Sequence, residues 1–186
     1  MCLDNMNATK IFTEVNWNIL KTVKTERLNL RDLAKKLEKT PATIHYNLKY
    51  LKEFGVVRIK KQKNQYIIVP DTENFYYRLF MQMINRESIQ QTKNLKELEK
   101  KGVIGIYGSF ARGTDDKNSD IDLFVFTQTN EIKIREIVNR LSRELGKEIN
   151  LLILNEQKLK DLKNDDYEFY IRLRLESMLF NGDIFA

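Results

Sequence analysis

A serine-led turn followed by two aspartates is the pattern in this sequence that points most directly to chemistry. The apolar run 103–107 leads into Gly108 and Ser109, and Asp120 and Asp122 follow after ten further residues. Gly108 lets the backbone turn sharply and approach a phosphate closely. Ser109 offers a hydroxyl and backbone N–H groups at the start of a short helix. Residues two apart on a strand point to one face, so the two aspartates should lie side by side.

Such a pair of carboxylates predicts a bound divalent cation. Two adjacent carboxylates repel each other unless a cation neutralises them. Mg²⁺ prefers one or two carboxylates together with the phosphates of a substrate. At this position it would activate an attacking hydroxyl and stabilise charge on a nucleotidyl phosphorus. The pattern therefore indicates a site for Mg²⁺ and a nucleoside triphosphate.

The stretch 108–122, with its flanking strands, resembles the minimal nucleotidyltransferases of the DNA polymerase β superfamily. It is similar in particular to those that act as antitoxins beside HEPN-type toxins, and the resemblance covers residues 95–186. The resemblance implies that Gly108 and Ser109 hold the triphosphate and that Asp120 and Asp122 hold Mg²⁺. It also implies a phosphate contact for Arg112, ATP as the expected triphosphate and a protein hydroxyl as the expected acceptor.

The same resemblance implies a third carboxylate on the strand 148–154, where it would bind the metal and act as a general base. The register places Asn150 at that position, and Asn can ligate through its carbonyl but cannot take a proton. Glu148 lies on the same face, displaced by about 6.6 Å along the strand. Two interpretations therefore stay open. One is an active transferase of nucleoside monophosphate; the other is a transcriptional regulator whose nucleotidyltransferase domain senses nucleotide or mediates assembly.

Positive charge is concentrated in the first third of the chain. Residues 1–70 hold 14 basic and 6 acidic side chains, a net charge of +8, whereas the whole 186-residue chain carries +6. Any attraction for polyanions therefore belongs to this segment. Such an asymmetry suggests two domains with different partners.

Three helices and a β-hairpin are expected in this basic segment. Helical spacing predicts helices over 9–24, 29–38 and 40–54, and β-prone runs at 56–59 and 66–69 flank a lysine-rich turn. This order resembles the winged helix-turn-helix family over residues 10–70. The resemblance implies that the third helix enters the major groove of double-stranded DNA and that the wing binds phosphates. The expected DNA-binding residues are Thr43, His45, Tyr46, Lys49, Lys60, Lys61 and Lys63.

Docking of another protein remains an alternative for this domain, because fold alone does not fix function. Nucleotide addition to RNA is the third and lowest-ranked alternative. Single-strand readers stack bases on exposed aromatic side chains, and Tyr46 alone is thin support for that.

The whole chain is expected to be α+β, with a mixed sheet and flanking helices in the nucleotidyltransferase fold. We predict a winged helix-turn-helix domain at 1–70, a helical linker at 71–101 and the nucleotidyltransferase domain at 102–186. The linker has an apolar stripe that would either pair with a second copy in a homodimer or pack within the chain. The residues of this stripe include Phe75, Tyr76, Phe80 and Met83.

Composition narrows the cellular setting. No apolar run exceeds four residues, whereas a membrane-spanning helix needs about twenty, so no membrane partner is expected. The start of the sequence lacks the basic and apolar regions of a signal peptide. The single Cys2 cannot form an internal disulfide, which fits a reducing compartment, and a cytoplasmic location is the expectation.

Overall fold

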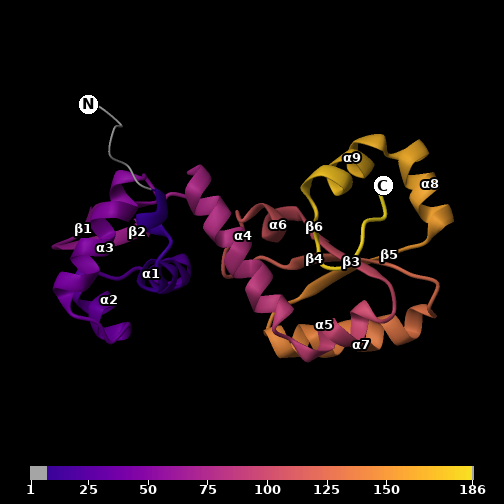
Figure 1. Ribbon diagram of the computed structural model, residues 1–186, viewed down its shortest axis with the longest axis horizontal. Coiled ribbons are helices and arrows are strands. Elements are labelled where there is room, and N and C mark those ends of the chain that lie inside the picture. The colour runs from indigo at the N-terminus through magenta and orange to yellow at the C-terminus, as the bar shows by residue number, and fades with distance from the viewer. Residues whose placement is uncertain (1–7, 186) are drawn as a thin grey trace. The chain divides into compact units, whose positions relative to one another are not determined.

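The computed structural model describes residues 8–185, so Cys2 lies outside the described residues. The chain divides into two compact units, Met1–Phe80 and Met81–Ala186. The division falls within helix α4 (Phe75–Gln90), in the segment predicted to be a linker (Figure 1). Among the described residues, no helix is long and apolar enough to cross a membrane.

The first unit consists of short helices followed by a hairpin. Its elements are η1 (Ala8–Ile11), α1 (Glu14–Thr25), α2 (Leu30–Lys36), α3 (Pro41–Glu53), β1 (Val57–Gln62) and β2 (Gln65–Pro70). Side-chain caps fix where the helices begin: Asn29 accepts from the backbone of Asp32, and Thr40 accepts from that of Thr43. Such caps satisfy backbone N–H groups that the first turn of a helix leaves without partners.

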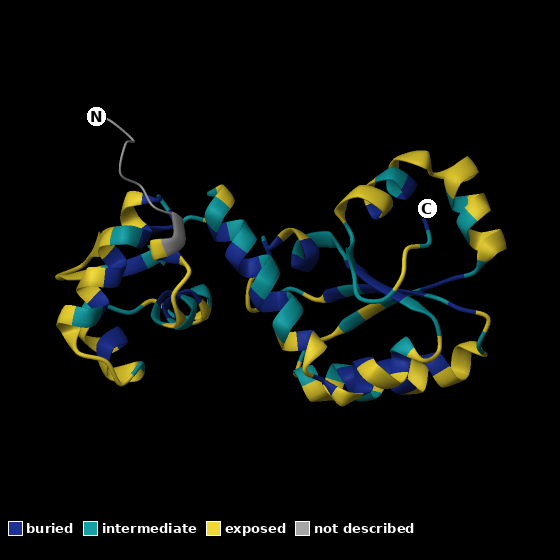
Figure 2. Cartoon of the chain, in the orientation of Figure 1, coloured by how far each residue is buried: buried dark blue, intermediate teal, exposed yellow. Residues whose placement is uncertain are grey.

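The apolar stripes of these helices meet in one core. Ile19, Leu33 and Ile44 are each fully buried, and Figure 2 shows the buried and exposed sides of the helices. The hairpin joins this core through Leu28, which bridges to the buried Ile68 on β2. The predicted order of three helices and a hairpin is therefore the order observed, within a few residues at each end.

The start of α4 belongs to this core and bears on the expected homodimer stripe. Phe80 is fully buried, with its ring 4.9 Å from that of Phe12 and 6.1 Å from that of Trp17. Phe80 therefore packs within the chain and is not available to a second copy. Phe75, by contrast, is 72% exposed.

The second unit is built around a mixed sheet. After α4 its elements are α5 (Lys93–Glu99), β3 (Val103–Tyr107), α6 (Gly108–Arg112), β4 (Ile121–Phe126), α7 (Glu131–Leu145), β5 (Ile149–Leu154), α8 (Glu156–Asp165), α9 (Tyr167–Glu176) and β6 (Met178–Leu179). In the described residues the strands pair in the order β5-β4-β3-β6. The β4–β5 pair is parallel, and β3 is antiparallel to both β4 and β6.

The two faces of this sheet carry different helices. Ile106, Leu123 and Val125 form one cluster with apolar residues of α5, α6 and α7. On the other face, Phe124 packs with Tyr170 and Leu173 of α9. Figure 1 shows α5 and α7 on one side of the strands and α8 and α9 on the other. Since side chains alternate along a strand, Asp122 shares the face of Phe124, which α9 covers.

The segment 71–101 forms two helices, because Thr92 caps α5 by accepting from the backbone of Leu95. At the end of the chain, Met178–Leu179 pairs with β3 as β6, and Phe185 packs against the rings of Phe124 and Tyr170.

Candidate functional site

Gly108 lies directly against the side chain of Asp122 in the candidate site. Asp122 is the cross-strand partner of Tyr107, the last residue of β3, and Gly108 follows with φ of +72°. A Cβ atom on Gly108 would lie 2.2 Å from Oδ2 of Asp122. Both the left-handed backbone and this contact require glycine. The turn after β3 therefore brings the start of α6 directly against a carboxylate.

Parallel pairing of β4 with β5 puts Asn150 directly opposite Asp122. The amide Nδ2 of Asn150 donates to Oδ1 of Asp122 over 3.1 Å. One step earlier, the backbone N–H of Ile121 donates to the carbonyl of Glu148. The same register therefore sets Glu148 beside Asp120, on the face that also carries Asp122 and Asn150.

The loop between α6 and β4 is held from both ends by side chains that sequence reasoning did not single out. The amide of Asn85, on α4, donates to the carbonyl of Phe110 over 2.8 Å and to the buried carboxylate of Asp115 over 2.7 Å. The ammonium of Lys147 donates to the backbone carbonyl of Ser119 over 2.9 Å. A polar residue within the apolar stripe of α4 was the available signal for Asn85.

A pocket of about 220 Å³ opens beside Asp122. The strand and turn contribute Tyr107, Gly108, Arg112 and Asp122, and α9 contributes Phe169, Arg172, Leu173 and Glu176. Ser109 and Asp120 are not part of this lining among the described residues. The pocket therefore joins three residues of the predicted site to a helix that the sequence analysis left without a role.

The pocket combines aromatic rings with opposite charges. Tyr107 and Phe169 meet edge to face at 5.7 Å, and the guanidinium of Arg172 lies 5.8 Å from the Phe169 ring. Nη1 of Arg112 donates to Oε2 of Glu176 over 3.1 Å. Burial raises the pKa of the Tyr107 hydroxyl, and the carboxylate of Asp122 raises it further. Tyr107 therefore keeps its proton at neutral pH.

The donor set fits Mg²⁺ held jointly with a phosphate, not a cation held by the protein alone. Within residues 8–185, no group of three His, Cys, Asp or Glu side chains could hold a metal. Asp120 and Asp122 supply two carboxylates on one face, and Asn150 has an amide oxygen. Mg²⁺ needs about this many protein ligands when substrate phosphates complete its shell. Because Gly108 has no Cβ, the space beside the carboxylate of Asp122 stays open to a ligand.

The residues expected to contact DNA from α3 lie largely on its outer side. His45, Tyr46 and Lys49 are exposed, and Thr43 is half-buried. The hydroxyl of Thr43 lies 2.9 Å from that of Thr40. The hydroxyls of Tyr46 and Tyr50 lie 2.9 Å apart, and their hydrogen-bonding interaction raises the pKa of Tyr46.

The hairpin lysines Lys60, Lys61 and Lys63 are all exposed. Lys60 pairs across the hairpin with Ile67, and Lys61 pairs with Tyr66. Successive strand residues alternate, so Lys60 and Lys61 point to opposite faces of the hairpin. Lys63 sits in the turn with φ of +52°. The three ammonium groups therefore surround the tip of the hairpin instead of sharing one face.

Comparisons with known proteins match each unit to a different family. Residues 87–166 match the family described as polymerase beta, nucleotidyltransferase, and residues 11–73 match the family HVO_A0114. No curated protein matches the chain.

Three solved structures are similar at 19% sequence identity. One is a mutant of the toxin–antitoxin complex MntA–HpeT, with 52% of this chain and 74% of that chain covered and a TM-score of 0.39. Another is a toxin–antitoxin with AMP-PNP, covering 49% and 73% with a TM-score of 0.37. The third is described as a nucleotidyltransferase from Sulfolobus solfataricus, covering 55% and 94% with a TM-score of 0.32.

The family match contains the turn at Gly108, both aspartates and the strand that carries Asn150. It begins within α4 and ends one residue after α8. Residues 87–166 are a polymerase beta-like nucleotidyltransferase domain.

Proposed function

We propose that the second unit binds a nucleoside triphosphate with Mg²⁺ and transfers its nucleotidyl group to an acceptor hydroxyl, with ATP as the preferred donor. In this reaction the acceptor oxygen forms a bond to the α-phosphorus, and the bond from that phosphorus to the β-phosphate bridging oxygen breaks. The products are a nucleotidyl-acceptor and pyrophosphate, and the hydroxyl proton is released. The contact between Gly108 and Asp122, inside a pocket that also holds Arg112, is the observation that carries the proposal.

Each residue of the turn has a part in this proposal. Gly108 admits the triphosphate close to the backbone, and Ser109 donates its hydroxyl to a phosphate oxygen. Asp120 and Asp122 hold Mg²⁺, and Arg112 binds a phosphate. When bound, Mg²⁺ would neutralise the phosphate oxygens and orient the triphosphate. Tyr107 keeps its hydroxyl proton and can donate a hydrogen bond beside Asp122.

The pairing of Asn150 with Asp122 favours a second candidate, a transcriptional regulator that senses nucleotide without turning it over. Asn150 donates to the carboxylate and cannot accept the proton of an attacking hydroxyl. Glu148, the residue before β5, places a carboxylate beside Asp120 instead. We therefore expect slow transfer by the natural sequence, and nucleotide binding without transfer would select the second candidate.

Labelling with radioactive ATP tests the transfer directly. The purified chain, incubated with Mg²⁺ and ATP labelled at the α-phosphate, should label itself or an added protein acceptor. Asp122→Ala should abolish the label, whereas Asp165→Ala, an exposed change at the end of α8, should not. Labelling that persists after both Asp120→Ala and Asp122→Ala would contradict the assignment.

Glu176→Gln is expected to tighten the binding of Mg–ATP by about two- to fivefold. The change removes a negative charge from the pocket and frees Arg112 from its ion pair. Exposed pairs of this kind contribute about 0–1 kcal/mol, which sets the size of the effect. Titration calorimetry of the whole chain measures it, with Glu168→Gln on the exposed side of α9 as the control. Weaker Mg–ATP binding by Glu176→Gln would contradict the assignment of Arg112 to the phosphate site.

We also propose that the first unit is a winged helix-turn-helix domain that binds double-stranded DNA. Its net charge of +8 over residues 1–70, the exposed side of α3 and the basic hairpin tip support this. Lysines around a hairpin tip would contact phosphates and would not read sequence. Nucleotide-dependent control of such binding would make the chain a transcription regulator.

Neutralising Lys60, Lys61 and Lys63 together, each to Gln, is expected to weaken DNA binding and flatten its salt dependence. Each lost phosphate contact lowers the slope of log K against log salt by about 0.9, so three contacts lower it by about 2.7. Fluorescence anisotropy with a labelled duplex at several salt concentrations measures both quantities.

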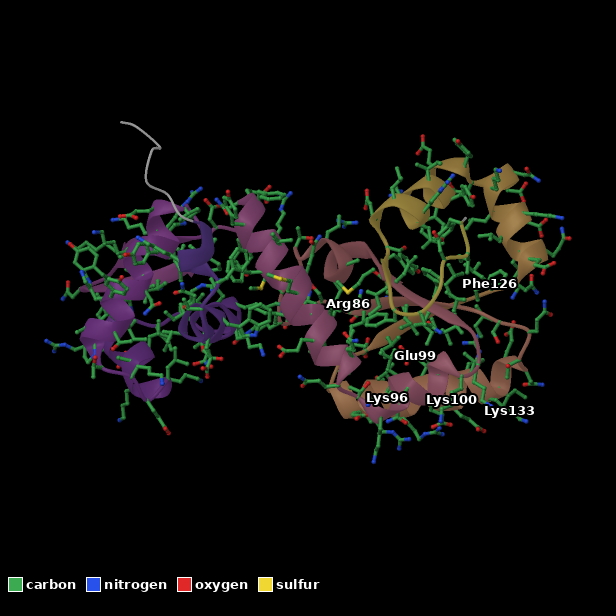
Figure 3. The ribbon with its side chains drawn as sticks, in the orientation of Figure 1. Arg86, Lys96, Glu99, Lys100, Phe126 and Lys133 are labelled. Carbon is green, nitrogen blue, oxygen red and sulfur yellow. The ribbon has the colours of Figure 1, made fainter. Side chains whose placement is uncertain are left out.

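The matched control neutralises three exposed lysines of the second unit. These are Lys96 on α5, Lys100 directly after α5 and Lys133 on α7, which are labelled in Figure 3. This control removes the same amount of charge from the whole chain. It therefore distinguishes the loss of specific phosphate contacts from a general effect of net charge. An unchanged slope in the hairpin variant would refute the assignment of the wing.

A further inference from the structure

Helix α9 lies beyond the residues that match the nucleotidyltransferase family. The match ends at residue 166, and α9 begins at Tyr167. Nevertheless α9 covers the sheet face that carries Asp122 and forms one side of the pocket there. Any ligand of the Asp122 carboxylate in this pocket therefore has α9 as a wall.

The size of the pocket decides how much of a nucleotide it can hold. Pockets that enclose a drug-sized ligand measure about 300–1,000 Å³, and this one measures about 220 Å³. The pocket therefore encloses only part of a triphosphate nucleotide, and the rest extends beyond its opening. If the phosphates bind at the turn that begins at Gly108, the nucleoside is the part of the nucleotide that reaches α9.

The α9 side has the chemistry of a nucleobase site. Phe169 is half-buried, and its ring meets that of Tyr107 at 5.7 Å, with the buried Leu173 next to it. Aromatic side chains stack favourably on any nucleobase, because every base has a π-face. The guanidinium of Arg172 already lies 5.8 Å from the Phe169 ring, and arginine planes stack on bases as well.

We propose that α9 supplies the nucleobase subsite of the nucleotide pocket, with Phe169 as the stacking ring and Arg172 at its open side. This inference rests on the proposed nucleotide site at Gly108 and Asp122. The strength of stacking depends on the area of the base and not on the hydrogen-bonding groups at its edge. The subsite therefore favours purines over pyrimidines, and ATP should bind more tightly than UTP.

The test compares a nucleotide with a ligand that has phosphates but no base. Binding of Mg–ATP, Mg–UTP and Mg–tripolyphosphate to the full chain is measured by titration calorimetry. Phe169→Ala should weaken Mg–ATP binding by about 5- to 100-fold, the range that loss of one stacked base implies. It should leave Mg–tripolyphosphate within about twofold, because that ligand has nothing to stack on.

Two further variants guard against a simple loss of structure. Phe169→Tyr keeps the ring and should retain Mg–ATP affinity, whereas Phe169→Leu keeps apolar volume without a ring and should lose it. Arg174→Ala, an exposed change on the same helix outside the pocket, should bind like the natural sequence.

The outcomes separate this inference from the proposed function. Tripolyphosphate and ATP bound equally well by the natural sequence, or weakened equally by Phe169→Ala, would overturn the subsite while the phosphate site stands. Failure of the natural sequence to bind either ligand would overturn the proposed function, and the subsite with it. A larger loss for ATP than for UTP in Phe169→Ala supports stacking.

Discussion

Gly108→Ala is expected to weaken Mg–ATP binding by about 10- to 100-fold, because the new methyl group occupies the space of the Asp122 carboxylate. The Cβ atom would lie 2.2 Å from Oδ2 of Asp122, so the carboxylate must turn away or the strand must shift. Contacts that involve a charged group contribute about 1.5–3 kcal/mol, which gives this range. Titration calorimetry with Mg–ATP, and separately with Mg²⁺ and pyrophosphate, measures the loss.

Gly146→Ala is the matched control, because it imposes the same kind of backbone strain without the contact. Gly146 caps the end of α7 with φ of +64°, and no described atom lies within 4 Å of a Cβ built there. A left-handed conformation costs a non-glycine residue about 1–2 kcal/mol, so both variants should unfold at a lower temperature. Only Gly108→Ala should lose nucleotide. Equal affinity of the two variants for Mg–ATP would show that Asp122 is not part of the phosphate site.

The turn and the aspartates are the part of the site that could be predicted from sequence, since short-range rules determine them. Gly108 and Ser109 follow an apolar strand, and the alternation of β4 puts Asp120 and Asp122 on one face. The register of β5 was also accessible, because the hydrophobic run 149–154 pairs in step with β4 and sets Asn150 opposite Asp122.

The other half of the pocket could not be predicted in the same way. Phe169, Leu173 and Glu176 recur at the spacing of one helix face, which indicates a core stripe and nothing more. Only the path of the chain after α8 turns that stripe toward Asp122 and adds Arg172. Long-range packing of this kind depends on the whole sheet. The periodicity of a single sequence therefore does not predict which residues such a helix face contacts.

Long-range contacts also explain why the sequence left open what Phe80 packs against. In the sequence it belongs to an apolar stripe that a second copy of the chain could cover as well as the chain itself. In the fold, Phe12 and Trp17, more than sixty residues away, already enclose it. The spacing of a stripe shows that it must be buried but not which partner buries it.

Asn150→Asp is expected to raise Mg²⁺-dependent nucleotidyl transfer by about 100-fold or more, because the new carboxylate can take the proton of the acceptor hydroxyl. General base catalysis contributes about 10²- to 10⁴-fold, and Asn150 already lies opposite Asp122. The rate of label transfer from ATP labelled at the α-phosphate measures the gain. An unchanged rate together with tight nucleotide binding would favour the sensing regulator over the slow transferase.

The same substitution is expected to make the stability of the fold depend on Mg²⁺. The amide of Asn150 now donates to Oδ1 of Asp122 over 3.1 Å, whereas an aspartate there would place two carboxylates together. Like charges at this distance raise the pKa of one of them, so the variant should lose stability as pH rises through that pKa and regain it at lower pH. Added Mg²⁺ should restore the thermal midpoint at neutral pH, by binding the folded state. Asn139→Asp, an exposed change on α7, should show neither response, and if it responds equally the effect belongs to net charge instead of the pair.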